Sequence, residues 1–141
     1  MIAEAALAVL AYTSPAPCAN VLAQQLHAVG FRGHRLQTAW AIAMRESKGH
    51  AAAISPTNDF GLFQFNRATW SKATWWDPAR LLDPVYNARV AWKLSQGGRT
   101  WYPWDISGRG EHLGRYSSSS TFRVFVRYLS EYPCRASSWR S

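Results

Sequence analysis

The chain has 141 residues, the size of one globular domain, and 48% of them are hydrophobic, which excludes a disordered tail. Its 16 Lys and Arg against 8 Asp and Glu give a formal net charge of +8, which favours anionic partners such as nucleic acid, membrane surfaces or bacterial cell wall. The basic residues are scattered between Arg32 and Arg140 without a run, so we do not expect a nucleic-acid partner. We predict a single domain over residues 1–141.

The two cysteines, Cys18 and Cys134, have no metal-binding spacing, and the four histidines do not complete a zinc pattern. We therefore expect no metal and no cofactor, while a disulfide and two reduced thiols both remain open. The N-terminal segment MIAEAALAVLAY lacks a basic n-region and is shorter than the roughly 20 residues that span a bilayer. It predicts a core helix, with no export signal and no transmembrane segment.

The first half of the chain predicts two helices and a small hairpin. The segment NVLAQQLHAVG (20–30) places its leucines on one stripe and ends on Gly30, as a helix does. A second helix is expected over 36–48. Residues 49–66 contain Gly, Pro, Asn and Asp among short apolar runs, which indicates a loop and a small β-hairpin.

The second half opens with two Asp-Pro pairs, in which Asp77 and Asp83 are expected to cap helices. The second pair begins a helix expected from about Pro84 to Gln96, and Asn87 falls inside its apolar arc. A buried amide must find partners, so Asn87 is expected to tie this helix to the hairpin or a loop. A Gly-rich aromatic loop follows, and the apolar periodicity after the serine run predicts a last helix carrying Phe122 and Phe125.

Glu46 is the acidic residue that the periodicity of the second helix does not explain. At 100° per residue from Leu36 it falls between Ile42 and Ala39, inside the apolar arc. Burial of a carboxylate tends to raise its pKa, and a carboxylic acid that stays protonated is what a general acid requires. Two structural alternatives remain: Glu46 reaches water at a frayed helix end, or it meets an arginine.

The segments RES and NDFGLFQFN, residues 45–47 and 58–66, resemble the active-site segment of the lysozyme superfamily, with a helix-borne Glu-Ser followed by an Asp-bearing strand. The segment YNARVAWKLSQGGRTWYPW (86–104) resembles a second one, an Asn-x-Ala helix followed by a Gly-rich turn and a W-x-x-W pair. The resemblance covers 36–104 and has the order of c-type lysozymes and phage-borne lysozyme-like domains. It implies a mainly α (α+β) lysozyme-like fold, helices around a small hairpin with an active-site cleft.

The resemblance also implies site residues, because glycoside cleavage commonly uses one protonated and one ionised carboxylate beside the bond. Glu46 corresponds to the general acid and Asp59 to the nucleophile or electrostatic partner. The remaining matched positions imply sugar-binding residues: Gln64 and Asn66 beside the strand, Trp101 as the apolar wall of the acid, and Trp104 as its companion. Asp105 and Glu111, in the aromatic loop, are the rivals of Asp59.

The expected activity is muramidase cleavage of the β-1,4 bond between N-acetylmuramic acid and N-acetylglucosamine in peptidoglycan. The chain departs from c-type lysozymes, because their disulfide framework is absent and the Glu46–Asp59 interval is shorter. Soluble lytic transglycosylases share the Glu-Ser element, so a transglycosylase giving 1,6-anhydro sugars is one alternative. A non-catalytic wall-binding module is the other.

We expect a monomer whose partner is bacterial peptidoglycan. Since no export signal is visible, we expect a bacteriolytic, phage-encoded protein, either an endolysin released through a holin or a module of the virion.

Overall fold

The computed structural model describes residues 18–104 and 120–134. In these ranges the α-helices are α2 (Val21–Val29), α3 (Gly33–Ser47), α4 (Arg67–Trp70), α5 (Pro84–Leu94) and α6 (Ser120–Ser130). The same ranges contain two 3-10 turns, η1 (Arg80–Leu82) and η2 (Tyr102–Trp104). They also contain two strands, β1 (Asp59–Phe60) and β2 (Phe65–Asn66). The strands are antiparallel, with Asp59 opposite Asn66. The predicted mainly helical fold with one small hairpin is confirmed.

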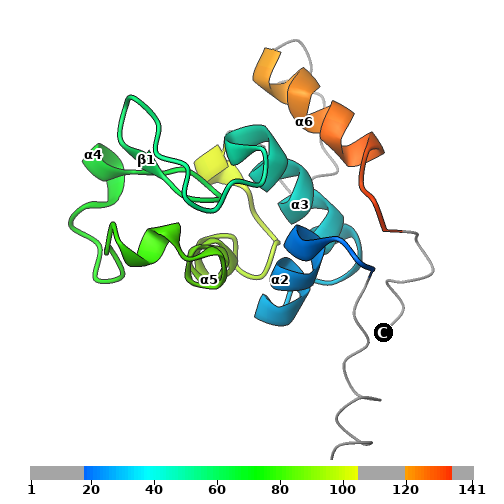
Figure 1. The fold of residues 1–141 in the computed structure, drawn as a ribbon, viewed down its shortest axis with the longest axis horizontal. Coiled ribbons are helices and arrows are strands. Elements are labelled where there is room, and N and C mark those ends of the chain that lie inside the picture. The colour runs from blue at the N-terminus through cyan, green and yellow to red at the C-terminus, as the bar shows by residue number, and fades with distance from the viewer. Residues whose placement is uncertain (1–17, 105–119, 135–141) are drawn as a thin grey trace, which may run out of the picture.

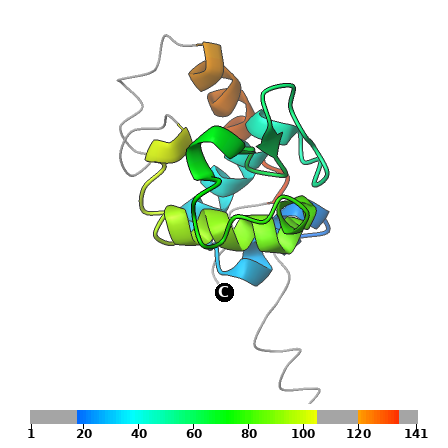
Figure 2. The same cartoon turned by 90° about the vertical axis from the view of Figure 1, so that its left-hand side faces the viewer.

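Helix α3 lies at the centre of the fold, with α6 on one side and α2 and α5 on the other, and both views show this arrangement (Figures 1 and 2). Its middle is buried all round rather than along one stripe, because residues 39–43 are each at most 5% exposed. Three of these five residues are alanines, whose small side chains allow neighbouring helices to approach closely. The hairpin and α4 project beyond one end of α3 (Figure 1).

The helix ends follow the signals in the sequence. Asn20 caps α2 by accepting a hydrogen bond from the Ala23 amide at 2.9 Å, and Gly30 ends this helix with a φ of 129°. Asp83 caps α5 in the same way, through the Tyr86 amide at 2.8 Å. Helix α3 begins at Gly33, three residues before the expected start, because Arg32 provides the first helical carbonyl without a side-chain cap.

Asn87 ties α5 to the hairpin, as the sequence predicts. Its side chain is 0% exposed; Oδ1 accepts from the Phe63 amide at 3.0 Å, and Nδ2 donates to the carbonyls of Phe60 (3.0 Å) and Leu81 (2.8 Å). Gly61 makes this close approach possible: a Cβ there would lie 2.1 Å from the Leu81 carbonyl oxygen, and its φ is 76°. One buried amide therefore joins the hairpin to α5 and to the η1 turn.

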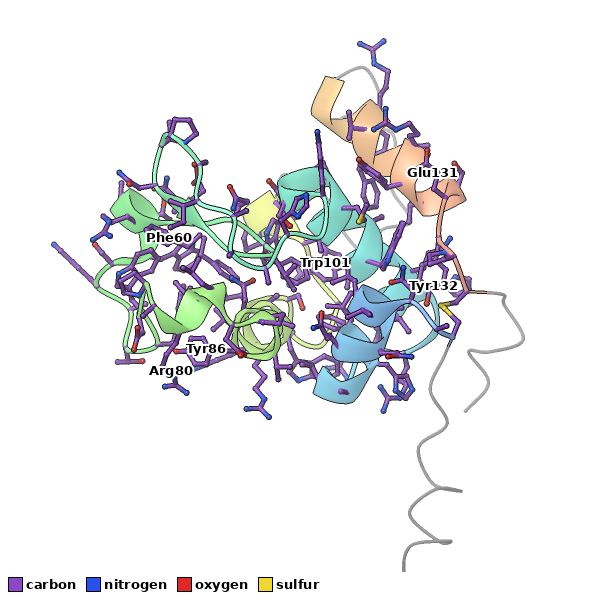
Figure 3. The ribbon with its side chains drawn as sticks, viewed as in Figure 1. Phe60, Arg80, Tyr86, Trp101, Glu131 and Tyr132 are labelled. Carbon is purple, nitrogen blue, oxygen red and sulfur yellow. A yellow bond between two sulfur atoms is a disulfide. The ribbon has the colours of Figure 1, made fainter. Side chains whose placement is uncertain are left out.

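An aromatic core fills the space between α3, α5 and the hairpin. Trp101, labelled in Figure 3, belongs to this core. Its ring is stacked with Phe31 at 5.8 Å and with Phe63 at 6.4 Å between ring centroids. Trp104 contacts the same Phe63 ring edge-on at 5.6 Å. These rings connect the segment after α5 to the hairpin turn.

Cys18 and Cys134 form a disulfide, with their Cα atoms 5.5 Å apart, which settles the alternative that the sequence left open. Helix α6 bears out the predicted last helix, with Phe122 and Phe125 buried. The expected helix within 1–12 and the loop after Trp104 lie outside the described residues. Within the described part of the chain, no helix is long and apolar enough to cross a membrane.

Candidate active site

Glu46 lies in the last turn of α3, and its side chain is 26% exposed. The carboxylate is therefore only partly buried. Oε1 accepts a hydrogen bond from Nη2 of Arg45 at 2.7 Å, an ion pair that matches one of the two alternatives left by the sequence. Oε2 has no hydrogen-bond partner among residues 18–104 and 120–134. One carboxylate oxygen is thus fixed by Arg45, while the described residues make no hydrogen bond to the other.

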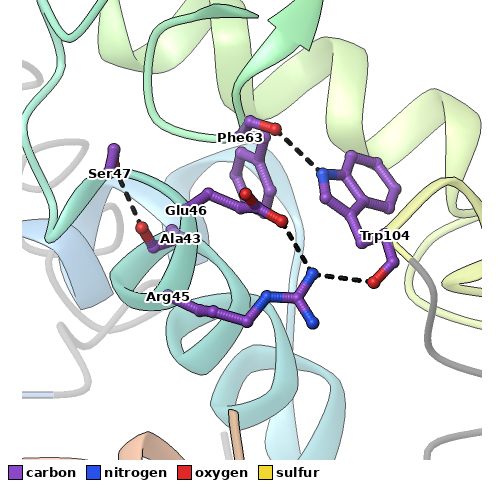
Figure 4. A network of polar contacts seen from close by, with 6 residues as sticks. All are labelled: Ala43, Arg45, Glu46, Ser47, Phe63 and Trp104. Atoms are coloured by element: carbon purple, nitrogen blue, oxygen red, sulfur yellow. Dashed lines mark hydrogen bonds and ion pairs between the residues drawn. The ribbon is translucent and has the colours of Figure 1, made fainter. Parts of the chain in front are cut away.

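Arg45 joins three segments of the chain at this carboxylate (Figure 4). The same Nη2 atom donates to the Trp104 carbonyl at 2.7 Å, and the arginine side chain is 9% exposed. Trp104 in turn donates its indole N–H to the Phe63 carbonyl at 2.9 Å. The end of α3, the η2 turn and the hairpin turn therefore meet around Glu46.

The serine of the Glu-Ser motif, Ser47, makes a hydrogen bond within α3. Ser47 is buried, and its hydroxyl donates to the Ala43 carbonyl at 3.0 Å within the helix. Lys48 follows in the left-handed conformation, with φ of 55°, and its amide bonds the Met44 carbonyl at 2.9 Å. This termination fixes the last turn of α3, and with it the backbone of Glu46.

Asp59 begins strand β1, and its carboxylate organises the turn before it. Its oxygens accept hydrogen bonds from the hydroxyls of Ser55 and Thr57 and from Nδ2 of Asn66, the last at 2.8 Å. Burial alone would raise the pKa of Asp59, but these three hydrogen bonds outweigh it and hold the pKa below its ordinary value of 3.8. Asp59 is therefore an ionised carboxylate at neutral pH.

The side chains of Gln64 and Asn66 also make hydrogen bonds within the hairpin region. Gln64 adopts a left-handed φ of 53°, and its Nε2 donates to the carbonyls of Gly61 (3.0 Å) and Ala53 (3.2 Å). Asn66 donates to Asp59 and to the Thr57 carbonyl, while its Oδ1 caps α4 through the Thr69 amide. Both side chains are half-buried, so their sugar-binding roles stay predictions, and the structure adds the hydrogen bonds that they make internally.

The two tryptophans, expected as the apolar wall of the acid and its companion, are both buried. Trp101 is 1% exposed and Trp104 is 5% exposed, which suits an apolar wall better than a stacking surface, and their roles beside the acid stay predictions. Both indoles belong to the aromatic core, and Trp104 reaches the site through its backbone carbonyl. Tyr102, between them, is 65% exposed and is the aromatic side chain of this turn that faces solvent.

The sequence missed Arg45, because the helical periodicity places it on the polar face of α3. Asp105 and Glu111, the rivals of Asp59, lie outside the described residues. No group of three or more His, Cys, Asp or Glu side chains within 18–104 and 120–134 is placed to hold a metal ion.

Comparison with known protein families matches residues 23–106 to the lysozyme-like domain. The match covers more than half of the chain and includes Glu46, the hairpin and α5. The chain therefore belongs to the lysozyme-like domain family. Membership indicates action on peptidoglycan, as a glycosidase or a transglycosylase. Neither the curated proteins nor the solved structures gave a match to the chain.

Proposed function

We propose that the chain cleaves the β-1,4 bond between N-acetylmuramic acid and N-acetylglucosamine, with Glu46 as the general acid. The observation that carries this proposal is the environment of the Glu46 carboxylate. This carboxylate lies in the last turn of α3, it is partly exposed, and its Oε2 is left without a partner in the described part of the chain. In the proposed reaction Oε2 is the oxygen that delivers the proton to the leaving-group oxygen.

In this proposal Arg45 acts as a positioning residue for Glu46. A general acid must be held within hydrogen-bond reach of the atom that it protonates, and a small misplacement lowers the rate strongly. Arg45 restrains Oε1 and is itself anchored on the Trp104 carbonyl, which the hairpin holds through Phe63. The position of the acid therefore depends on three segments rather than on one flexible side chain.

Asp59 supplies the charge that complements the cationic sugar centre of the transition state. Its lowered pKa keeps it ionised, and a polar, hydrogen-bonded carboxylate is the second member of the lysozyme-type pair. Three hydrogen bonds already occupy its two oxygens. This engagement favours electrostatic stabilisation by Asp59 over nucleophilic attack.

The same engagement favours a second candidate, a lytic transglycosylase. In that reaction a group of the sugar itself attacks the cationic centre and forms a 1,6-anhydro product, so the enzyme needs no nucleophilic carboxylate. The acid would again be Glu46. The two candidates differ in the product and in their dependence on Asp59.

Product analysis separates the candidates. Purified peptidoglycan is incubated with the full-length protein, and the released muropeptides are analysed by mass spectrometry. Reducing-end sugars support hydrolysis, and 1,6-anhydro sugars support transglycosylation. Wall binding in a pull-down without any released muropeptide would overturn both and leave the non-catalytic module.

The place of action that we propose is the bacterial cell wall, outside the reducing cytoplasm. The Cys18–Cys134 disulfide supports it, because such bonds persist in oxidising environments. The net charge of +8 supports it as well, since it draws the protein towards an anionic wall.

A further inference from the structure

A depression of about 550 Å³ lies near the N-terminal end of α3, the end opposite to Glu46. Residues from α3, the end of α5 and the turn after it line the depression: Arg35, Trp92, Lys93, Gln96, Gly97 and Arg99. Arg35 is in the first turn of α3 and Glu46 in the last, and a rise of 1.5 Å per residue separates them by about 16 Å along the helix. The depression is therefore distinct from the candidate active site.

Trp92 gives the depression a fixed wall. A Cβ at Gly30 would lie 3.2 Å from the indole ring, and a Cβ at Gly97 would lie 3.1 Å from it, so both glycine backbones are in contact with the ring. Phe31 packs edge-on against Trp92 with ring centroids 5.0 Å apart. The indole is half-buried, so its position is set by the core while part of it remains accessible.

The backbone that carries the cations is also fixed. Ser95 is 0% exposed; its hydroxyl accepts from the Gly98 amide at 2.9 Å, and its carbonyl accepts from the Arg99 amide at 2.8 Å. Gly98 has a φ of 87°, and a Cβ there would lie 2.9 Å from the Cβ of Arg35. The stem of Arg35 therefore packs on the same turn from which Arg99 projects.

The charge of the depression is uncompensated by the described part of the chain. Arg35, Lys93 and Arg99 line it, and no acidic side chain does. The ion pairs within residues 18–104 and 120–134 are Arg45–Glu46 and Arg127–Glu131, which involve none of these three cations. The carbonyl end of α5 attracts Lys93, but a helix dipole is equivalent to only about half a charge and does not balance three cations.

We propose that this depression binds a phosphodiester group of an anionic cell-wall polymer. Two guanidinium groups and an ammonium group around one hollow suit the phosphate oxygens, which arginine binds through paired hydrogen bonds. Gln96 adds an amide donor, and the Trp92 ring offers an apolar surface to the adjoining polyol or sugar. The choice of a wall polymer rests on the proposed function, whereas the phosphate chemistry rests on the depression alone.

The shape of the site favours this partner over nucleic acid. The three cations line one depression, whereas nucleic-acid surfaces need cations spread along a track that follows the phosphates. A site of this kind would hold the protein on the wall while Glu46, at the other end of α3, remains free for the glycan.

The test uses the full-length protein and a glycerol-phosphate oligomer, with uncharged polyglycerol and duplex DNA as comparison ligands, in titration calorimetry. The site variant is Arg35→Gln/Lys93→Gln/Arg99→Gln. The matched control is Lys72→Gln/Arg80→Gln/Arg123→Gln, which removes the same charge from exposed positions elsewhere. Circular dichroism verifies that both variants are folded.

We expect the wild type to bind the glycerol-phosphate oligomer and not polyglycerol, and we expect the site variant to weaken this binding at least about tenfold. The control variant should weaken it less than about threefold. Equal losses in both variants, absence of binding by the wild type, or tighter binding of duplex DNA with the same dependence on the site cations would each overturn the proposal. Because the experiment measures binding without cleavage, a negative result would overturn the binding proposal and leave the catalytic proposal for Glu46 untouched.

Discussion

Arg45 and Glu46 are adjacent in the chain, and their side chains form an ion pair with 2.7 Å between Nη2 and Oε1. Successive residues of a helix point about 100° apart, so adjacent side chains do not normally face each other. The contact forms because Arg45 folds over the end of α3 to reach the Trp104 carbonyl, 59 residues further along the chain. The candidate acid therefore takes its position from a tertiary contact.

If Arg45 positions Glu46, its removal should lower the rate more than the affinity. We expect Arg45→Met to reduce kcat about tenfold to a hundredfold with KM nearly unchanged, because the acid loses its fixed geometry. The kcat of Arg45→Lys, which keeps a cation but not the planar guanidinium, should lie between those of the wild type and Arg45→Met. Steady-state kinetics on soluble glycan fragments give both constants, and an unchanged kcat in Arg45→Met would remove the positioning role.

We expect the loss of the Asn87 side chain to lower the free energy of unfolding strongly. In Asn87→Ala the Phe63 amide and the carbonyls of Phe60 and Leu81 lose their side-chain partner. Each buried polar group left without a partner costs about 1–3 kcal/mol, so we expect a loss of at least about 3 kcal/mol in urea unfolding. The control is Gln24→Ala, which removes one exposed amide bond to the Cys18 carbonyl and should cost less than about 1 kcal/mol. Similar losses in the two variants would contradict this account.

Residues with a strong local signal were predictable from the sequence. Gly30 and Asp83 mark helix ends where they were expected, because capping depends on a few neighbouring residues. Asn87 was predictable for a different reason: an amide inside an apolar arc has to be satisfied by other segments. The helical fold and the small hairpin follow from such local patterns.

The environment of the candidate acid was not predictable in the same way. Helical periodicity places Arg45 on the polar face of α3. It contains no information about the Trp104 carbonyl in η2, to which Arg45 donates a hydrogen bond. It also could not show that Trp101 and Trp104 are buried, because short turns have no periodic face and their burial depends on Phe31 and Phe63. Tertiary packing decided both points.

The disulfide should contribute strongly to stability. Cys18 and Cys134 close a loop with a sequence separation of 116, for which the loop-entropy relation gives about 4–5 kcal/mol. We expect Cys18→Ser/Cys134→Ser to unfold at a clearly lower temperature than the wild type. Addition of a reductant should lower the Tm of the wild type towards that of the variant and leave the variant unchanged. A wild-type Tm that does not respond to full reduction would contradict the expectation.

Asp59 should make stability depend on pH in the acid range. Because its pKa in the folded protein is below 3.8, the unfolded chain takes up the proton first as the pH falls. The contribution of Asp59 is therefore fully present well above pH 3.8 and is lost as the pH falls below that value. Urea unfolding of the wild type and Asp59→Asn between pH 3 and pH 7 should show a stability difference that shrinks at the acid end. A difference that is constant over this range would mean that the carboxylate is not stabilised by its hydrogen bonds.

The most direct test of the proposed function compares two Glu→Gln variants in the release of muropeptides from purified peptidoglycan. Glu46→Gln removes the proton donor and preserves the shape of the side chain. Glu131→Gln changes an exposed carboxylate in the turn that follows α6. The account predicts that Glu46→Gln loses at least about a hundredfold in rate while Glu131→Gln keeps wild-type activity. Wild-type rates in Glu46→Gln would contradict the central claim, that this carboxyl group donates the proton that breaks the glycosidic bond.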